Sequence, residues 1–100
     1  MKRAEGNRMM AERYRNRYAK KLFNPATIAT AIDAVAMEGH RQYRVVQEIP
    51  FDLSETDAAH ELEEWLKDQN FAYSWRPRYL ERDAFRPSIA TEHPELVIAW

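Results

Sequence analysis

The sequence contains no cysteine, and this absence removes several kinds of chemistry at once. Disulfides, thiolate nucleophiles, iron–sulfur clusters and cysteine-based zinc sites are all excluded. No run approaches the roughly 20 apolar residues of a membrane-spanning helix, and the basic N-terminus lacks the apolar segment of a secretion signal. We therefore expect a protein of a reducing compartment, cytoplasmic by default, with no membrane partner.

Signatures of catalysis and of metal binding are also missing. His40, His60 and His93 are dispersed, and there is no glycine-rich phosphate loop and no nucleophile motif. His60 and Glu64 lie one helical turn apart, but two ligands are too few for zinc, and such pairs are common on exposed helices. We predict a protein that is not an enzyme, with no catalytic residue, no metal and no cofactor.

The charge of the chain is unevenly distributed. The 100 residues carry a formal net charge of −1, and 45% of them are apolar, which is typical of one folded domain. Residues 1–22 hold eight basic and two acidic side chains, so they carry +6 and the other 78 residues carry −7. We divide the chain into a basic N-terminal helix, residues 1–23, and a compact domain, residues 24–100.

Three helices are expected from the pattern of apolar residues. The first spans about residues 7–22, where Met10, Tyr14, Tyr18 and Leu22 recur every four positions. The second starts at Asn24-Pro25, a good N-cap followed by a proline suited to the first turn, and ends near Glu38, before a left-handed Gly39. The third starts after Ser54 or Thr56 and runs to about Gln69, with an acidic outer face.

Alternating apolar residues predict three strands, over residues 42–49, 71–75 and 96–100. The last has two apolar faces, which favours a central or covered position. The connection between the second and third strands is unusually long. It could hold a short helical turn within residues 77–85, or the two strands could extend into it as a long hairpin.

The order of elements indicates an α+β fold. We predict a small, mainly antiparallel three-stranded sheet packed by the second and third helices, with the basic N-terminal helix as an addition. A parallel crossover through the third helix is the alternative, because about 21 residues separate the first two strands.

One candidate surface for protein binding is the segment 73–79, which concentrates tyrosine, tryptophan and arginine. Tyr73 and Trp75 share a face with Phe71 and are expected in the core. The other candidate is the acidic helix, for which a solvated face is the simpler interpretation. The candidates are Arg76, Arg78, Tyr79, Glu61, Glu64 and Asp68.

The N-terminal helix is a candidate for nucleic-acid binding, because its arginines and lysines are interleaved with tyrosines. The alternative is that this helix lies over the acidic third helix, within one chain or across a homodimer, where the two charge sets neutralise each other. The candidates are Arg8, Arg13, Arg15, Arg17, Lys20, Lys21, Tyr14 and Tyr18.

The arrangement of Ala31-Ile32, Glu38-Gly39, residues 62–66, Asn70-Phe71 and the terminal residues 97–100 resembles small accessory proteins of tailed bacteriophages. The resemblance covers about residues 28–100 and carries over no functional residue. It implies a non-enzymatic viral protein, acting in the host cytoplasm.

Two hypotheses follow for function. The first is a binding module that engages a host or viral protein by surface contact and inhibits a host factor by occlusion. The second is a nucleic-acid-binding accessory protein that uses the basic helix, or a small component of the virus particle.

Overall fold

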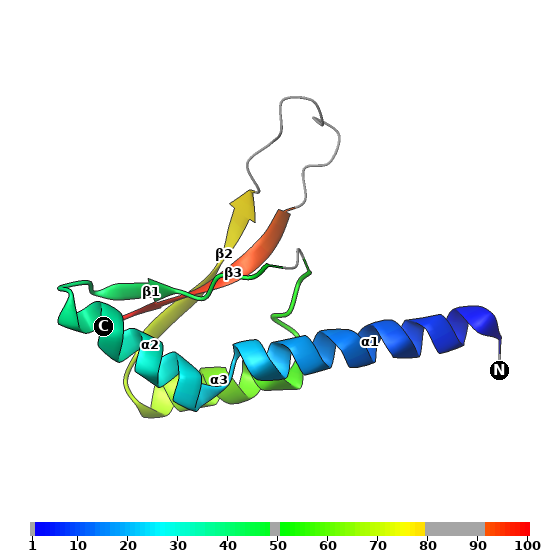
Figure 1. Cartoon of the computed structure of the whole chain (residues 1–100), viewed down its shortest axis with the longest axis horizontal. Helices are drawn as coiled ribbons and strands as arrows, with labels where there is room; N and C mark the ends of the chain where they lie inside the picture. Colours follow the sequence, from blue (N-terminus) through cyan, green and yellow to red (C-terminus); the bar gives the residue numbers. More distant parts are fainter. Residues whose placement is uncertain (1, 49–50, 80–91) are drawn as a thin grey trace.

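The computed structural model describes residues 2–48, 51–79 and 92–100. Their arrangement is the expected α+β fold, with the elements in the predicted order (Figure 1). The elements are α1 (Arg3–Leu22), α2 (Pro25–Met37), β1 (Gln42–Arg44), α3 (Asp57–Asp68), β2 (Ala72–Tyr79) and β3 (Glu92–Ala99).

The three strands of the described residues form one antiparallel sheet in the order β1-β3-β2. The predicted central position of the last strand is therefore confirmed. β1 and β2 do not pair with each other, but both run antiparallel to β3 and are therefore parallel, so the connection through α3 is a crossover with β3 inserted between its two strands. The long-hairpin alternative is confirmed for the described part of the connection. The two strands pair from Ala72 opposite Ala99 to Tyr79 opposite Glu92, so both are longer than predicted.

Strand β1 is shorter than the predicted range 42–49, and Pro94 gives the physical reason. Val45 still donates its backbone N–H to the Leu96 carbonyl oxygen, at 2.9 Å. Two residues further, the ladder would need an N–H from Pro94, which has none. The Gln47 N–H instead donates to a carboxylate oxygen of Glu95, at 3.2 Å, and the segment leaves the sheet.

Local signals set the helix ends as predicted. The Asn24 side chain accepts hydrogen bonds from the N–H groups of Ala26 and Thr27 at the start of α2, which ends before Gly39, at a φ of 92°. Of the two candidate caps for α3, Thr56 is the one used. Its hydroxyl accepts from the Ala59 N–H at 3.2 Å, whereas Ser54 bonds to Asp52.

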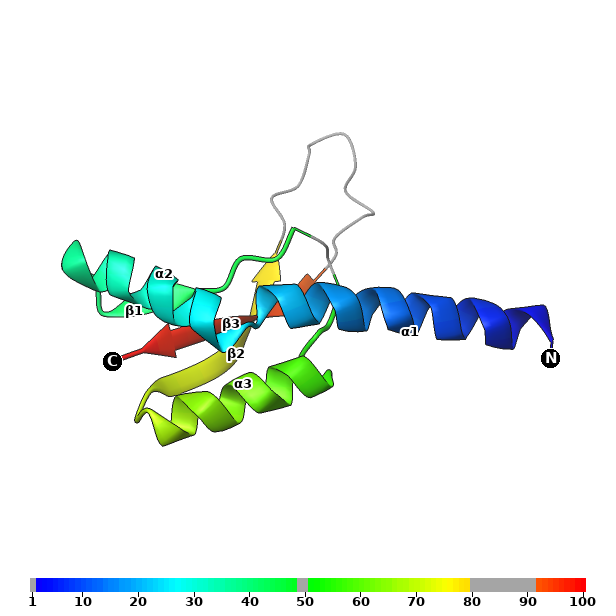
Figure 2. The same ribbon diagram turned by 60° about the horizontal axis from the view of Figure 1, so that its bottom comes forward.

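The core lies between one face of the sheet and the helices (Figures 1 and 2). Helices α2 and α3 cover this face, as predicted, with α2 next to β1 and α3 next to β2, and the end of α1 joins the core through Ala19 and the following Phe23. The predicted apolar stripe of α1 is only partly buried, since Met10 and Tyr14 are exposed. The buried core residues are Ala19, Phe23, Ile28, Ile32, Val45, Leu53, Ala59, Leu62, Leu66, Leu96 and Ile98.

Candidate functional site

Helix α1 projects from the domain. Its 20 residues begin four positions earlier than predicted, at Arg3, and all of residues 7–17 are exposed. Figures 1 and 2 show its N-terminal half extending past the sheet and the other helices. Seven basic and two acidic side chains give this helix a net charge of +5. The molecule therefore presents an elongated cationic rod to solvent.

Two of the predicted nucleic-acid-binding residues turn toward the domain. The Arg15 guanidinium carbon lies 4.7 Å from the centre of the Phe51 ring, a cation–π contact. The Tyr18 hydroxyl accepts a hydrogen bond from the Glu48 N–H at 3.0 Å, and this side chain is half-buried. Both residues therefore help to hold α1 on the domain. Tyr18 belongs to the predicted apolar stripe, whereas nothing in the sequence singled out Arg15 for this role.

The other predicted residues of α1 are exposed. Tyr14, Arg17 and Lys21 surround, together with the half-buried Tyr18, a shallow hollow of about 200 Å³. A wider hollow of about 510 Å³ lies along Arg13, Asn16, Arg17 and Lys20. Within the described part of the chain, no ion pair within 4.0 Å involves a cation of α1. Besides Arg15, the exposed residues of the predicted set are Arg8, Arg13, Tyr14, Arg17, Lys20 and Lys21.

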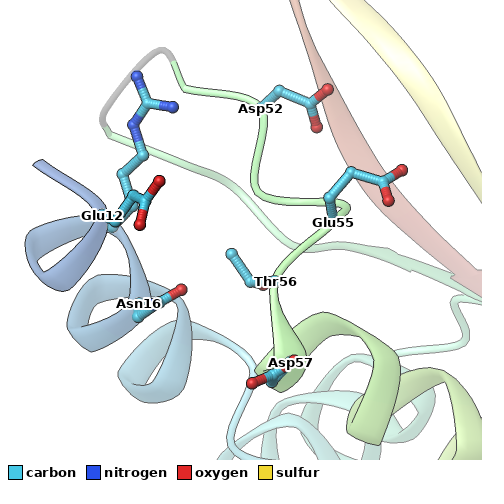
Figure 3. A pocket seen from close by; sticks show the side chains of 7 residues that line it. Glu12, Asn16, Asp52, Glu55, Thr56 and Asp57 are labelled. Carbon is cyan, nitrogen blue, oxygen red and sulfur yellow. The ribbon is translucent and has the colours of Figure 1, made fainter. Parts of the chain in front are cut away.

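The opposite side of α1 faces acidic residues across an open groove of about 380 Å³ (Figure 3). Its lining combines Arg15 with the carboxylates of Glu12, Asp52, Glu55 and Asp57. In an adjacent hollow, Lys20 lies with Asp57 and Glu61. The predicted juxtaposition of the basic and acidic helices thus occurs within one chain at the end of α1. Among the described residues, Arg13, Arg17 and Lys21 still have no carboxylate within 4.0 Å.

The candidates for protein binding are less concentrated. Tyr73 and Trp75 pack against the core as expected, and Arg76 is exposed on the opposite face of β2, where its Nε donates to the Ser74 hydroxyl at 3.2 Å. Arg78 and Tyr79 belong to β2, but their side chains lie outside the described residues.

The acidic candidates of α3, Glu61, Glu64 and Asp68, are exposed. His60 does not pair with Glu64. Its Nδ1 lies 3.3 Å from an oxygen of Glu63, while Glu64 pairs with Lys67 at 3.5 Å and raises the pKa of that lysine. The described residues contain no group of three histidines or carboxylates placed to hold a metal ion.

A buried polar cluster on β3 was missed by sequence analysis. Glu95 is only 1% exposed, accepts the Gln47 N–H and lies 3.8 Å from the Nε of Arg44. The ring of His93, also buried, lies 3.9 Å from the same carboxylate. The alternation of His93 and Glu95 along the chain would have placed them on one strand face, had the strand been predicted to begin there.

Replacing Glu95 with alanine should lower the free energy of unfolding by about 1–3 kcal/mol, because the buried Gln47 N–H loses its charged acceptor. Urea unfolding followed by circular dichroism measures this loss. Glu48→Ala is the matched control, since the Glu48 side chain is exposed, and its expected change is within about 0.5 kcal/mol. Equal effects of the two substitutions would show that the Glu95 carboxylate has no structural role.

Comparisons with protein-family models, with curated proteins and with solved structures find no match to this chain. None of the helices in the described ranges combines the length and the apolar character needed to cross a bilayer.

Proposed function

We propose that this chain is a non-enzymatic binding protein whose helix α1 holds the phosphate backbone of a nucleic acid. The observation that carries this proposal is the exposure of residues 7–17 on a helix of net charge +5 that projects from the domain. Basic side chains that neutralise phosphates release condensed counterions, which supplies most of the non-specific affinity for nucleic acids.

The energetics of α1 support an anionic partner. An isolated helix of this length is marginally stable in water, and neighbouring like charges lower its stability further. Arg13, Arg17 and Lys21 follow one another at four-residue spacing, so each lies next to a like charge. A polyanion along this side would replace the repulsion with attraction and would stabilise the helix.

A protein partner is the second candidate, and the exposed methionines of α1 favour it. Met9 and Met10 are 44% and 60% exposed, and Met10 lies one turn from Tyr14. Helices that dock into a partner's groove use apolar anchors at such spacings. Arg76 and the acidic side of α3 stay further candidates for the same role.

Inhibition of a host protein, a phage origin and a location in the host cytoplasm stay predictions from the sequence.

Removing three outward cations tests the first candidate. We expect Arg13→Ala, Arg17→Ala and Lys21→Ala together to weaken nucleic-acid binding and to lower the slope of log affinity against log salt by about 2–3, since each lost phosphate contact removes about 0.7–0.9. Fluorescence anisotropy with a labelled oligonucleotide, titrated between about 50 and about 200 mM salt, measures both quantities.

The control removes three exposed cations elsewhere, by Arg41→Ala, Lys67→Ala and Arg76→Ala, and makes the same change in net charge. Its salt slope should stay close to that of the wild type. If wild-type protein binds no nucleic acid at low salt, the proposal fails. Capture of a protein partner that is insensitive to salt and is lost in Met10→Ala would then support the second candidate.

A further inference from the structure

The hollow formed by Tyr14, Arg17, Tyr18 and Lys21 combines two aromatic rings with two cations. On a helix, residues three and four positions apart are neighbours, so each ring lies beside the other ring and beside a cation. Base–aromatic stacking and phosphate neutralisation are the two interactions by which proteins hold single-stranded nucleic acids. The hollow therefore has both in one place.

Tyr18 is the fixed wall of this hollow. Its hydroxyl accepts the Glu48 N–H at 3.0 Å and its side chain is half-buried, so the loop after β1 holds the ring in place. Tyr14 is 50% exposed, one turn closer to the N-terminus, and in the described residues it has no polar contact or ring partner. One ring is thus anchored by the domain, and the other is available to a ligand.

The size of the hollow also limits its ligand. At about 200 Å³ and open to solvent, it is smaller than the roughly 300–1,000 Å³ clefts that enclose drug-sized molecules. It suits one planar ring laid on Tyr14 while Arg17 or Lys21 meets an adjoining phosphate. Bases of a duplex are stacked on one another and do not expose a face, whereas bases of a single strand do.

We propose that α1 binds single-stranded nucleic acid in preference to duplex, with an unpaired base stacked on Tyr14 in the hollow beside Arg17, Tyr18 and Lys21. This inference rests on the proposed function, because it assigns a class of nucleic acid to the same helix. The phosphate contacts of Arg13 and Lys20 are shared by both kinds of strand, so the discrimination comes from Tyr14.

The test compares three labelled probes of about 12 nucleotides: oligothymidylate, oligouridylate and a mixed-sequence DNA duplex. We expect Tyr14→Ala to weaken binding of a single strand by roughly 5- to 150-fold and to leave duplex binding almost unchanged. Tyr14→Phe keeps the ring and should bind like the wild type. Asn7→Ala removes an exposed side chain of α1 outside the hollow and should have no effect.

The outcomes separate the two proposals. Binding to neither single strand nor duplex overturns both. Equal wild-type affinity for single strand and duplex, or equal loss on both in Tyr14→Ala, overturns the preference and leaves the phosphate-binding role of α1 intact. A preference for single strands that Tyr14→Ala abolishes supports the inference, and the comparison of oligothymidylate with oligouridylate then assigns it to DNA, to RNA or to both.

Discussion

Replacing Phe23 with alanine should lower the free energy of unfolding by about 3–5 kcal/mol. Phe23 is 2% exposed, and its ring meets that of Trp75 edge-on, with the ring centres 5.7 Å apart. The residue lies between α1 and α2, where it joins both helices to the core beneath β2 and β3. Because a domain of this size is stable by only about 5–15 kcal/mol, the loss would be a large share of the total.

Urea titration monitored by tryptophan fluorescence measures this loss. Met37→Ala is the matched control, because Met37 is also a large apolar side chain beside a helix end but is 89% exposed. Its expected change is within about 0.5 kcal/mol. A loss of less than about 1 kcal/mol in Phe23→Ala would mean that the core does not extend to the α1–α2 junction.

Reversing three charges of α1 should have the largest effect on binding. Arg13→Glu, Arg17→Glu and Lys21→Glu together change the net charge of α1 from +5 to −1. Attraction to phosphates then becomes repulsion, and we expect nucleic-acid affinity at about 50 mM salt to fall by at least about 100-fold. Fluorescence anisotropy measures this fall, and circular dichroism reports whether α1 is still helical.

The fold should tolerate this variant. All three side chains are exposed, and glutamate is a good helix former. The acid at position 21, in the last turn, is unfavourable toward the helix dipole by about 0.3–1 kcal/mol. The opposite reversal on α3, with Glu61→Lys, Glu64→Lys and Asp68→Lys, is the control and should not weaken binding. Unchanged affinity in the α1 variant would show that α1 does not bind the nucleic acid.

The ends of α2 and α3 were predictable because their signals are local, whereas α1 begins at Arg3 without a side-chain cap and was predicted four residues too short. Asn24, Thr56 and Gly39 act on backbone groups within a few residues of themselves, so a short stretch of sequence contains the whole interaction. The acidic outer face and the buried Leu62 and Leu66 of α3 follow in the same way from the period of one helix.

The lengths of the strands were not predictable, because they depend on residues distant in the chain. β1 ends where it does because Pro94 and Glu95, about fifty positions later, provide a missing N–H and a competing carboxylate. The pairing of β2 with β3 likewise continues past Trp75 and places Pro77 opposite Pro94. Each strand therefore contains one proline, and the two prolines face each other in the ladder.

The candidate site shows the same division. Composition identified α1 as basic, but it could not say which side of α1 meets the domain. Of the four-residue stripe, Tyr18 and Leu22 pack on the core while Met10 and Tyr14 are exposed. The structure also buries Ala19 and turns Arg15 inward, and neither residue belongs to that stripe. Which side of α1 faces the domain depends on its contacts with α3 and with the loop after β1. These contacts divide the basic residues of α1 into some that hold the helix on the domain and others that are exposed to a ligand.

The most direct test is a map of the bound surface by NMR. The backbone amide signals of the ¹⁵N-labelled protein are recorded while single-stranded oligothymidylate is added at low salt. We expect the perturbed amides to cluster on α1 around Tyr14, Arg17 and Lys21, while the signals of α3 and β2 stay in place. Perturbations confined to α3 or to the Arg76 side of β2, with α1 unaffected, would contradict it.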